Sequence, residues 1–318
     1  MSGFTTDTVT HLTRSNLWTT QLKELFDDER MAMRYVNWID SFPDGDTWNQ
    51  PSIGRAEVLD YEEDQPLKYT AMDTGNFTMT ITEYVQSGTY ITNKLKQDSY
   101  VADQLIAKFV PEQNRAIMVD LETKILAVGP DGQTSANSNT INGGKHRFVG
   151  SGTNETITPE DFAKARYALQ AANVPMTNLV AIVDPSVEYA LSTMTNLVNV
   201  SFNPTWEGIV RNGMSSGTRF LMSVYGWDIY TSHYLKVNTT TEAIDGITAT
   251  LGVNNLFFSA TSGMLPFIGA IRQPVKVDSK YNMDYQRDEY ATTMRYGLKL
   301  HRPENLVVIL TDTDQVYV

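Results

Sequence analysis

An alternation of apolar and hydroxyl side chains in residues 75–93 constrains the fold of this chain more than any other sequence feature. Phe77, Met79 and Ile81 are each followed by a threonine. This period of two predicts a strand with one buried face. The preceding residues 53–74 are also extended in character, so the two segments predict a long antiparallel ribbon. Because an isolated two-stranded ribbon is only marginally stable in water, we expect a second surface to cover its apolar face.

The composition limits the classes of function that this chain can have. It has 318 residues, of which 41% are hydrophobic and 19% charged, as in globular proteins. It contains no cysteine, which excludes disulfides, thiolate nucleophiles and cysteine-ligated metals. A net charge of −12 argues against a protein that grips nucleic acid through its phosphates, but not against one that encloses it. No apolar run is long enough to cross a bilayer and no secretory signal is evident, so we expect a cytoplasmic origin and no membrane partner.

Helical patterns dominate the first half of the chain outside the ribbon. Residues 1–20 are rich in Thr, Ser and Asn and indicate an arm without its own core. Apolar residues at near-helical spacing then predict a helix from residue 20 to about residue 40. The longest helical pattern covers residues 99–128, where Pro111 predicts a kink or the start of a second helix. Residues 129–158 are polar and predict a long flexible or interacting loop.

A compact α/β pattern begins at Thr158. This residue is expected to cap a helix, with a proline in the first helical position. A buried strand is predicted over residues 178–183, after which Asp184 caps a second helix. Residues 217–235 predict two strands joined at a glycine, and several further strands are expected from residue 254 to the end.

Residues that could carry catalysis or bind a metal are few. We expect His146 to be solvated in the polar loop, His233 to be packed or exposed on a strand, and His301 to lie at a strand end. The Gly-Lys pair before His146 lacks the other residues of a phosphate-binding loop. The acidic run at residues 57–64 lacks the central glycine of a calcium loop and is better interpreted as solvated or facing a partner. We therefore predict a protein that is not an enzyme and needs no metal or organic cofactor.

The order of these elements, together with two sequence stretches, resembles the major capsid proteins of tailed bacteriophages. The stretch GTRFLMSVYGWDIYTSHYL, residues 217–235, is similar to that family's pattern of apolar residues, Gly, an aromatic residue and Asp before a strand. The stretch DEYATTMRYGLKLHRPENLVVIL, residues 288–310, is similar to the family's final segment, in which Arg-Pro-Glu separates two strands. The resemblance implies an α+β chain with the Hong Kong ninety-seven type coat fold.

The resemblance also implies a division of the chain and a function. The expected parts are an N-terminal arm and helix (1–52), an extended β-hairpin loop (53–98), a peripheral domain with a spine helix (99–157), an axial domain (158–253) and return strands of the peripheral domain (254–318). The implied function is self-assembly, as hexamers and pentamers, into the icosahedral head shell that encloses double-stranded DNA without sequence-specific binding. Implied partners are a separate scaffolding protein, because little sequence precedes the loop, a portal and a decoration protein. The protein would be assembled in the host cytoplasm and located in the virion.

The same resemblance gives a hypothesis for the contact between subunits. A neighbouring subunit would bury the ribbon face that carries Phe77, Met79 and Ile81. The ribbon also holds carboxylates without any Lys or Arg among them, namely Glu57, Asp60, Glu62, Glu63 and Asp64. The C-terminal stretch is rich in cations, namely Arg272, Lys276, Lys280, Arg287, Arg295, Lys299 and Arg302. We hypothesise that the acidic limb of one subunit docks against some of these cations on the next.

Two alternatives remain open at this point. One is a β-rich carbohydrate-active or receptor-binding protein, in which aromatic residues and carboxylates line a groove. The other is a smaller capsid decoration protein or adhesin. The tryptophans are dispersed along the sequence, which favours core or interface positions over a binding groove.

Overall fold

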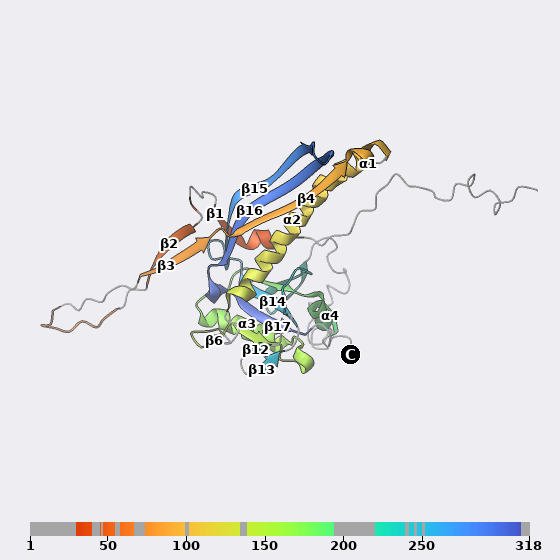
Figure 1. Cartoon of the computed structure of the whole chain (residues 1–318). Helices are drawn as coiled ribbons and strands as arrows, with labels where there is room; N and C mark the ends of the chain where they lie inside the picture. Colours follow the sequence, from red (N-terminus) through yellow and green to blue (C-terminus); the bar gives the residue numbers. More distant parts are fainter. Residues whose placement is uncertain are drawn as a thin grey trace, which may run out of the picture.

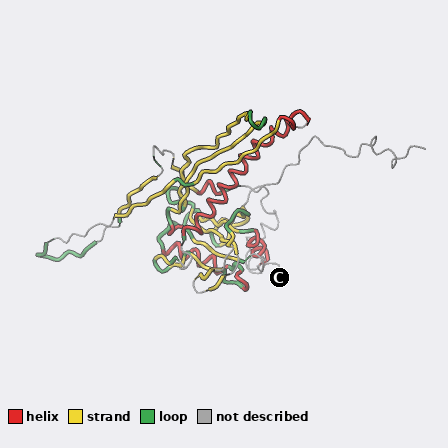
Figure 2. Tube along the Cα trace, in the orientation of Figure 1, coloured by secondary structure: helices red, strands yellow, loops and turns green. Residues whose placement is uncertain are grey.

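The computed structural model of this chain has a compact body from which two projections extend in different directions (Figure 1). One projection is an arm built from strands and a long helix, and the other is a hairpin of two strands. The tube view in Figure 2 shows the strands of the arm running side by side along the helix. The structure describes residues 30–39, 45, 47–54, 58–66, 74–98, 102–133, 139–193, 220–238, 242–244, 247–249 and 252–312.

The body is organised around a seven-stranded sheet. Its main strands, in spatial order, are β7 (Arg147–Val149), β17 (Val307–Thr311), β14 (Gly252–Ser259), β8 (Leu179–Val183), β10 (Trp227–Thr231) and β9 (Phe220–Val224), and β11 (Val237–Asn238) pairs with β14. The central strands β8, β14 and β17 are buried along their whole length. Their near-continuous apolar sequences are typical of strands that are covered on both faces.

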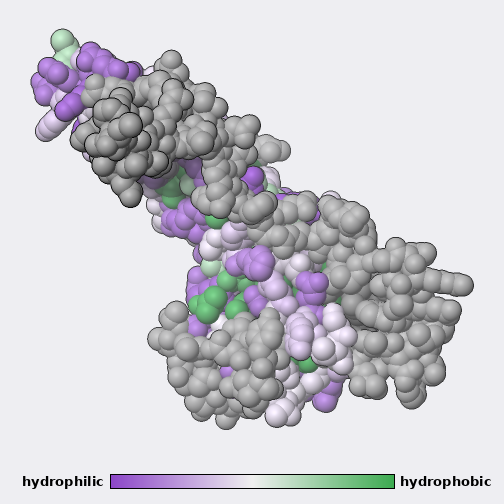
Figure 3. Space-filling model, turned by 90° about the vertical axis from the view of Figure 1, so that its right-hand side faces the viewer, coloured by the Kyte–Doolittle hydropathy of each residue, from purple (hydrophilic) through white to green (hydrophobic). Residues whose placement is uncertain are grey.

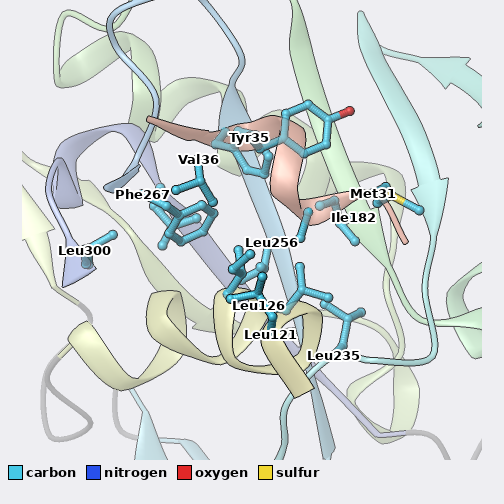
Figure 4. Close-up of a cluster of buried hydrophobic side chains, with 14 of the residues drawn as sticks. Met31, Tyr35, Val36, Leu121, Leu126, Ile182, Leu235, Leu256, Phe267 and Leu300 are labelled. Carbon is cyan, nitrogen blue, oxygen red and sulfur yellow. The ribbon is translucent and has the colours of Figure 1, made fainter. Parts of the chain in front are cut away.

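Helices cover both faces of this sheet. The helices are α1 (Asn93–Asp98), α2 (Ala102–Gly132), α3 (Pro159–Ala171) and α4 (Pro185–Thr193), with short 3-10 turns η1 (Ala32–Tyr35), η2 (Thr153–Glu155) and η3 (Pro303–Asn305). Residues of α3 and α4 form one core with alternate residues of β8, such as Ala181. Residues of α2 and η1 form the other core with the intervening residues, such as Ile182. Figure 4 shows this second core, where Leu121 and Leu126 of α2 face Ile182 and Leu256.

The predicted helix caps and the predicted glycine turn are confirmed. Thr158 and Asp161 form a reciprocal capping box at the start of α3. The carboxylate of Asp184 accepts a hydrogen bond from the backbone nitrogen of Ser186, at 2.9 Å, at the start of α4. Strands β9 and β10 are joined by Tyr225 and Gly226, both with positive φ. This backbone geometry matches the twist of a two-residue hairpin turn, which explains the glycine.

The arm is a four-stranded sheet packed on α2. Its order is β1 (Val36–Ile39), β15 (Phe267–Asn282), β16 (Arg287–Leu300) and β4 (Glu83–Thr92). Alternate side chains of β16 turn toward α2: Thr292 Oγ1 donates to Gln113 Oε1 at 2.9 Å, and Tyr296 Oη donates to Asp120 Oδ2 at 3.0 Å. The long helix predicted over residues 99–128 is confirmed as α2, which continues through Pro111 as one helix.

The helix predicted for residues 20–40 is wrong where the structure describes it; residues 20–29 lie outside the described part. After the short turn η1, Val36 and its neighbours form strand β1, which pairs in parallel with β15. Val36 is 5% exposed and belongs to the core beneath α2. For a β-branched residue such as Val36, packing against the edge of a sheet contributes more stability than a helical conformation of the local sequence would.

The ribbon differs from the prediction in its pairing. The strand that pairs with β3 (Thr74–Thr80) is β2 (Thr47–Ile53), which starts earlier than expected. The continuation, β4, leaves the ribbon and joins β16 in the arm. Met79 and Ile81 are 0% and 3% exposed and pack against Ile268 and Ala270 of the same chain. The chain therefore covers this apolar face itself, which removes the reason for assigning it to a neighbouring subunit.

The polar region at residues 129–158 is more ordered than expected. It contains the end of α2, the hairpin β5 (Thr140–Ile141) and β6 (Gly144–Lys145), and strand β7. The prediction of a solvated His146 is wrong: this residue is fully buried, with its ring nitrogens 3.0 and 3.1 Å from the carbonyl oxygens of Gly144 and Glu304. Burial lowers the pKa of His146, although the two carbonyls act in the opposite direction.

The sheets do not follow the expected boundary at residue 253. Strands β14 and β17 come from the C-terminal part but lie in the body sheet beside β8, whereas β15 and β16 lie in the arm. The chain thus crosses between body and arm more often than the linear division implied. A separate hairpin, β12 (Glu242–Ile244) and β13 (Ile247–Ala249), packs on the body through Ile244.

Candidate inter-subunit surfaces

The acidic limb lies on the projecting hairpin. Strands β2 and β3 form a ladder from Thr47 opposite Thr80 to Ile53 opposite Thr74, so the connecting residues are carried away from the body (Figure 1). All side chains of residues 58–66 are exposed, including Asp60, Glu62, Glu63 and Asp64; the predicted Glu57 lies outside the described residues. Val58 and Tyr61, among these acids, are 94% and 79% exposed.

Four of the seven predicted cations share one face of the arm sheet. Because alternate residues of a strand lie on one face, the residues of β16 next to Met294 point away from α2. The face away from α2 carries Lys276, Lys280, Arg287 and Arg295. We call it the basic face. Its outer edge carries Tyr84 and Tyr90 of β4, which are 59% and 57% exposed.

The basic face also holds carboxylates, which reduce its charge. Lys276 pairs with Asp278 at 2.9 Å, and Arg287 Nε pairs with Glu289 Oε1 at 2.7 Å. The hydrogen bond from Arg287 lowers the pKa of the exposed Glu289. Four cations and two carboxylates leave this face weakly positive, in a chain whose net charge is −12.

The other three predicted cations lie elsewhere and have contacts within the chain. Arg272 Nη1 donates to the carbonyl oxygen of Gly45. Lys299 Nζ donates to the carbonyl oxygen of Thr78 at 2.6 Å, and Arg302 lies 3.7 Å from Glu304. The structure therefore does not bring these three together with the basic face.

The far end of the arm forms a further exposed surface that the sequence analysis missed. Tyr281, Met283 and Tyr285, in the hairpin between β15 and β16, are 46%, 77% and 67% exposed. The guanidinium of Arg287 lies 4.3 Å from the ring centroid of Tyr90 and 4.7 Å from that of Tyr285. Hydrophilic side chains gather around this end on the face drawn in Figure 3. The density of tyrosines in YNMDYQRDEY was the available signal, because tyrosine, methionine and arginine are enriched at protein interfaces.

Strand β4 is fixed to α2 by a charged cluster beneath the arm sheet. Lys124 Nζ lies 2.5 Å from Glu83 Oε2 and 3.5 Å from Asp120 Oδ2. Burial acts to lower the pKa of Lys124, but the hydrogen bond to Glu83 and the charge of Asp120 outweigh it and raise this pKa. Burial, with the adjacent Asp120, raises the pKa of the Tyr296 hydroxyl. The cluster is structural, since each charge is matched by a partner in the same chain.

Among the described residues, no group of three or more His, Asp or Glu side chains is placed to hold a metal ion. In the same part of the chain, no helix is long and apolar enough to cross a membrane.

Comparisons with known proteins place the fold. No protein-family model matches the sequence, and no curated protein matches it. Solved structures match over nearly the whole chain. A chain from Mycobacterium phage Che8 has a TM-score of 0.68 at 18% identity, covering 92% of this chain and 96% of that one. A chain from the capsid of cyanophage P-SCSP1u has a TM-score of 0.69 at 18% identity, covering 95% and 94%.

A third structure, the capsid asymmetric unit of cyanophage Pam1, has a TM-score of 0.68 at 12% identity and covers 96% of this chain and 98% of that one. At these identities the likeness establishes the fold. The chain has the mixed α and β Hong Kong ninety-seven type fold, as the resemblance implied.

Proposed function

We propose that this chain is the major capsid protein of a tailed bacteriophage, whose copies self-assemble into the head shell around double-stranded DNA. The observation that carries the proposal is the extent of the structural likeness. At least 95% of this chain aligns with chains from two phage capsids, and at least 94% of those chains is covered in return. The match therefore includes the projections as well as the body. Long projections have little use in an isolated monomer, but they provide contact area between copies.

The proposal assigns roles to the parts of the molecule. The arm, with α2 as its spine, would form the peripheral domain, and the seven-stranded body with α3 and α4 would form the axial domain. The return strands β14 and β17 then belong to the axial part, in contrast to the linear division at residue 253. The protein would be non-enzymatic and located in the virion, after assembly in the host cytoplasm. Its net charge of −12 would keep packaged DNA from adhering to the shell wall.

Copies of the same chain are the primary partners in this proposal. They would assemble as hexamers and pentamers, with a separate scaffolding protein during assembly, a portal at one vertex and a decoration protein on the outer surface. The fully exposed acidic limb supports a role in contacts between copies. Val58 and Tyr61 lie among its acids and expose apolar area that a neighbour could cover.

We further propose that the acidic limb of one copy docks on the basic face of the next. The limb carries four described carboxylates on an exposed projection, and the basic face carries Lys276, Lys280, Arg287 and Arg295. Each exposed ion pair contributes only about 0–1 kcal/mol. In a closed shell the contact is repeated in every copy, and incorrect registers would bring like charges together. Electrostatics would then select the register, while Tyr61, Tyr84 and Tyr90 supply apolar burial.

Electron microscopy of the purified full-length protein, alone and coexpressed with its genomic neighbours, tests the proposed function. We expect closed shells, or tubes and rings built from hexameric units. Discrete small particles under all conditions would contradict a shell-forming role and favour a decoration protein. The alternative of a β-rich carbohydrate-active protein is not favoured, because the fold matches chains of phage capsids over nearly its whole length.

A further inference from the structure

The two long edges of the arm sheet differ in how they are protected. Beyond Ala270, where the pairing with β1 ends, the edge strand β15 has a proline, two breaks in register and four charged side chains, Arg272, Lys276, Asp278 and Lys280. Proline, charged side chains and bulges are the features by which natural sheets keep an edge from pairing with another chain. The opposite edge strand, β4, has none of them from Tyr84 to Thr92, and it pairs with β16 without a break in register.

The free side of β4 presents a regular row of backbone hydrogen-bonding groups. Among the described strands, β4 pairs only with β16, on the side toward β15 (Figure 1). At the end of this ladder Asn93 N donates to Gln286 O at 3.0 Å. Because the backbone groups of alternate residues point to opposite sides of an antiparallel strand, the odd-numbered residues of β4 bond to β16. The N–H and C=O groups of the even-numbered residues therefore face outward, namely those of Tyr84, Gln86, Gly88, Tyr90 and Thr92.

The sequence of this edge is complementary to itself. When a second copy of β4 runs antiparallel with Gly88 opposite Gly88, Gln86 lies opposite Tyr90, and Tyr84 lies opposite Thr92. Every outward N–H group then meets an outward C=O group of the other copy. Since the stretch is uncharged, this register brings no like charges together.

The side chains beneath the sheet fit the same register. On the side that faces α2, Val85 lies opposite Ile91, and Ser87 lies opposite Thr89. Pairs of β-branched side chains and pairs of hydroxyl side chains are favourable when they lie opposite each other on neighbouring strands.

Helix α2 leaves room for this pairing. Its hydrogen bonds to Thr292 and Tyr296 place it beneath β16, one strand in from the edge. The α2 helices of the two copies would be separated by three strand spacings, about 14 Å. Helices in direct contact are only about 8–10 Å apart, so the two helices would not clash.

Gly88 has no role within its own chain that requires a glycine. A Cβ at this position would be in ordinary contact, 3.6 Å from the carbonyl oxygen of Tyr290, and the φ of Gly88 is not in the left-handed region. A glycine inside a strand weakens the strand and often marks a place where another backbone comes close. Gly88 occupies the position at which the two copies would meet.

We propose that β4 pairs with β4 of a second copy about a two-fold axis at Gly88, which joins the two arm sheets into one continuous sheet. The contact is isologous, because each copy contributes the same strand. It is separate from the docking of the acidic limb, since it uses the edge of the arm sheet and not its basic face. The inference needs only two copies and does not depend on the proposed capsid function.

Because the chain has no cysteine, single introduced cysteines report the register. In Gly88→Cys the two introduced residues are opposite each other, with their Cα atoms about 5.5 Å apart, which is within the range of a disulfide. Gln86→Cys is the matched control on the same face of the strand, because in this register its two copies are about 14 Å apart. Under mild oxidation of the full-length protein, we expect Gly88→Cys to form disulfide-linked dimers at least about tenfold faster than Gln86→Cys.

Amide hydrogen exchange tests the same pairing in the parent protein. The amides of Gly88 and Tyr90 should exchange more slowly as the protein concentration rises. Gly88→Lys places two like charges opposite each other and should abolish this slowing.

Three results would count against the proposal or separate it from the proposed function. Equal rates of cross-linking for the two cysteine variants, both in the unassembled subunit and in any shells, would overturn it. Slow exchange of the Gly88 and Tyr90 amides in a protein that sediments as a monomer would also overturn it, because a segment of the same chain would then cover the edge. Shells that form without the Gly88 cross-link would overturn the pairing and leave the shell function intact.

Discussion

Glu122 Oε1 accepts a hydrogen bond from the backbone nitrogen of Met31 at 2.8 Å, across 91 residues of sequence. The same oxygen accepts a second hydrogen bond from Ala32 at 2.7 Å. Both donors lie at the start of η1, where a helical turn leaves backbone N–H groups without partners of its own. Glu122 is fully buried in the middle of α2. One side chain thus fixes the beginning of the described chain to the spine of the arm.

This anchor predicts a specific loss of stability. In Glu122→Leu two buried donors lose their acceptor, at about 1–3 kcal/mol each. We expect the free energy of unfolding of the unassembled subunit, measured by urea denaturation, to fall accordingly. Glu122→Gln keeps an acceptor oxygen and should lose less. Glu112→Leu, at an exposed glutamate of the same helix, is the control and should change little. Equal stabilities of the Glu122→Leu variant and the parent would show that the anchor contributes nothing.

The same residue predicts a dependence of stability on pH. Burial raises the pKa of Glu122 above its ordinary value of 4.5, although the hydrogen bonds from Ala32 and Met31 oppose this shift. The folded state therefore binds the proton more tightly than the unfolded state. This contribution to stability is complete below pH 4.5 and is lost as the pH rises through the folded-state pKa. Urea midpoints of Glu122→Gln should lack this decline, and parallel pH profiles for variant and parent would refute the assignment.

Because the chain buries one part of the ribbon and exposes another, substitutions at two of its residues should affect different properties: one the stability of the subunit, the other the assembly of shells. Met79 is 0% exposed and Tyr61 is 79% exposed. Met79→Ala should lower the free energy of unfolding of the subunit by about 2–5 kcal/mol, as for other buried methionines. Tyr61→Ala should change it by less than about 0.5 kcal/mol but reduce the yield of shells. A stable Met79→Ala subunit that fails only to assemble would restore the earlier view that a neighbour covers this residue.

The two parts of the ribbon should also differ in what their removal does. Ile53 and Thr74 are opposite each other in the ladder of β2 and β3, so a short Gly/Ser turn can replace residues 54–73 without disturbing either strand. We expect a folded subunit with a cooperative thermal melt that forms no large particles on sedimentation. Replacing residues 73–93 removes β3 and β4 from the chain's own core and should prevent folding. Normal shells from the first variant would contradict a role of the limb in assembly.

Docking of the acidic limb on the basic face predicts a dependence on charge and salt. Glu62→Lys with Glu63→Lys should reduce assembly at low salt, and adding Lys276→Glu with Lys280→Glu should restore part of it. Turbidity and sedimentation against salt concentration provide the measurement, because ions at 1 M screen charges beyond about 3 Å. If the lysine variant assembles as well as the parent at low salt, the electrostatic contact is wrong, and the shell function is unaffected.

The elements that could be predicted from the sequence are those with a strong local signal. The helix cap at Thr158, the buried strand before Asp184 and the turn at Gly226 are all present, and the helix predicted over residues 99–128 is found over residues 102–132. The caps and the turn are determined by interactions between residues close in sequence. The long helix follows from apolar residues that recur at helical spacing over many turns. The sequence could identify the seven cations of the C-terminal stretch, but it could not show which four of them lie together on the basic face.

The sequence by itself determined the local conformations, the absence of cysteine chemistry, the net charge and the exposed acidic limb. Tertiary structure decided the rest. Val36 is in a strand because β15 offers a free edge, and Met79 is buried because Ile268 and Ala270 lie beneath it. His146 is buried because the C-terminal Glu304 packs against it. In each case the stabilising partner lies more than 150 residues away in sequence. Burial against such a partner removes the side chain from water, and this contribution outweighs the conformational preference of the local sequence.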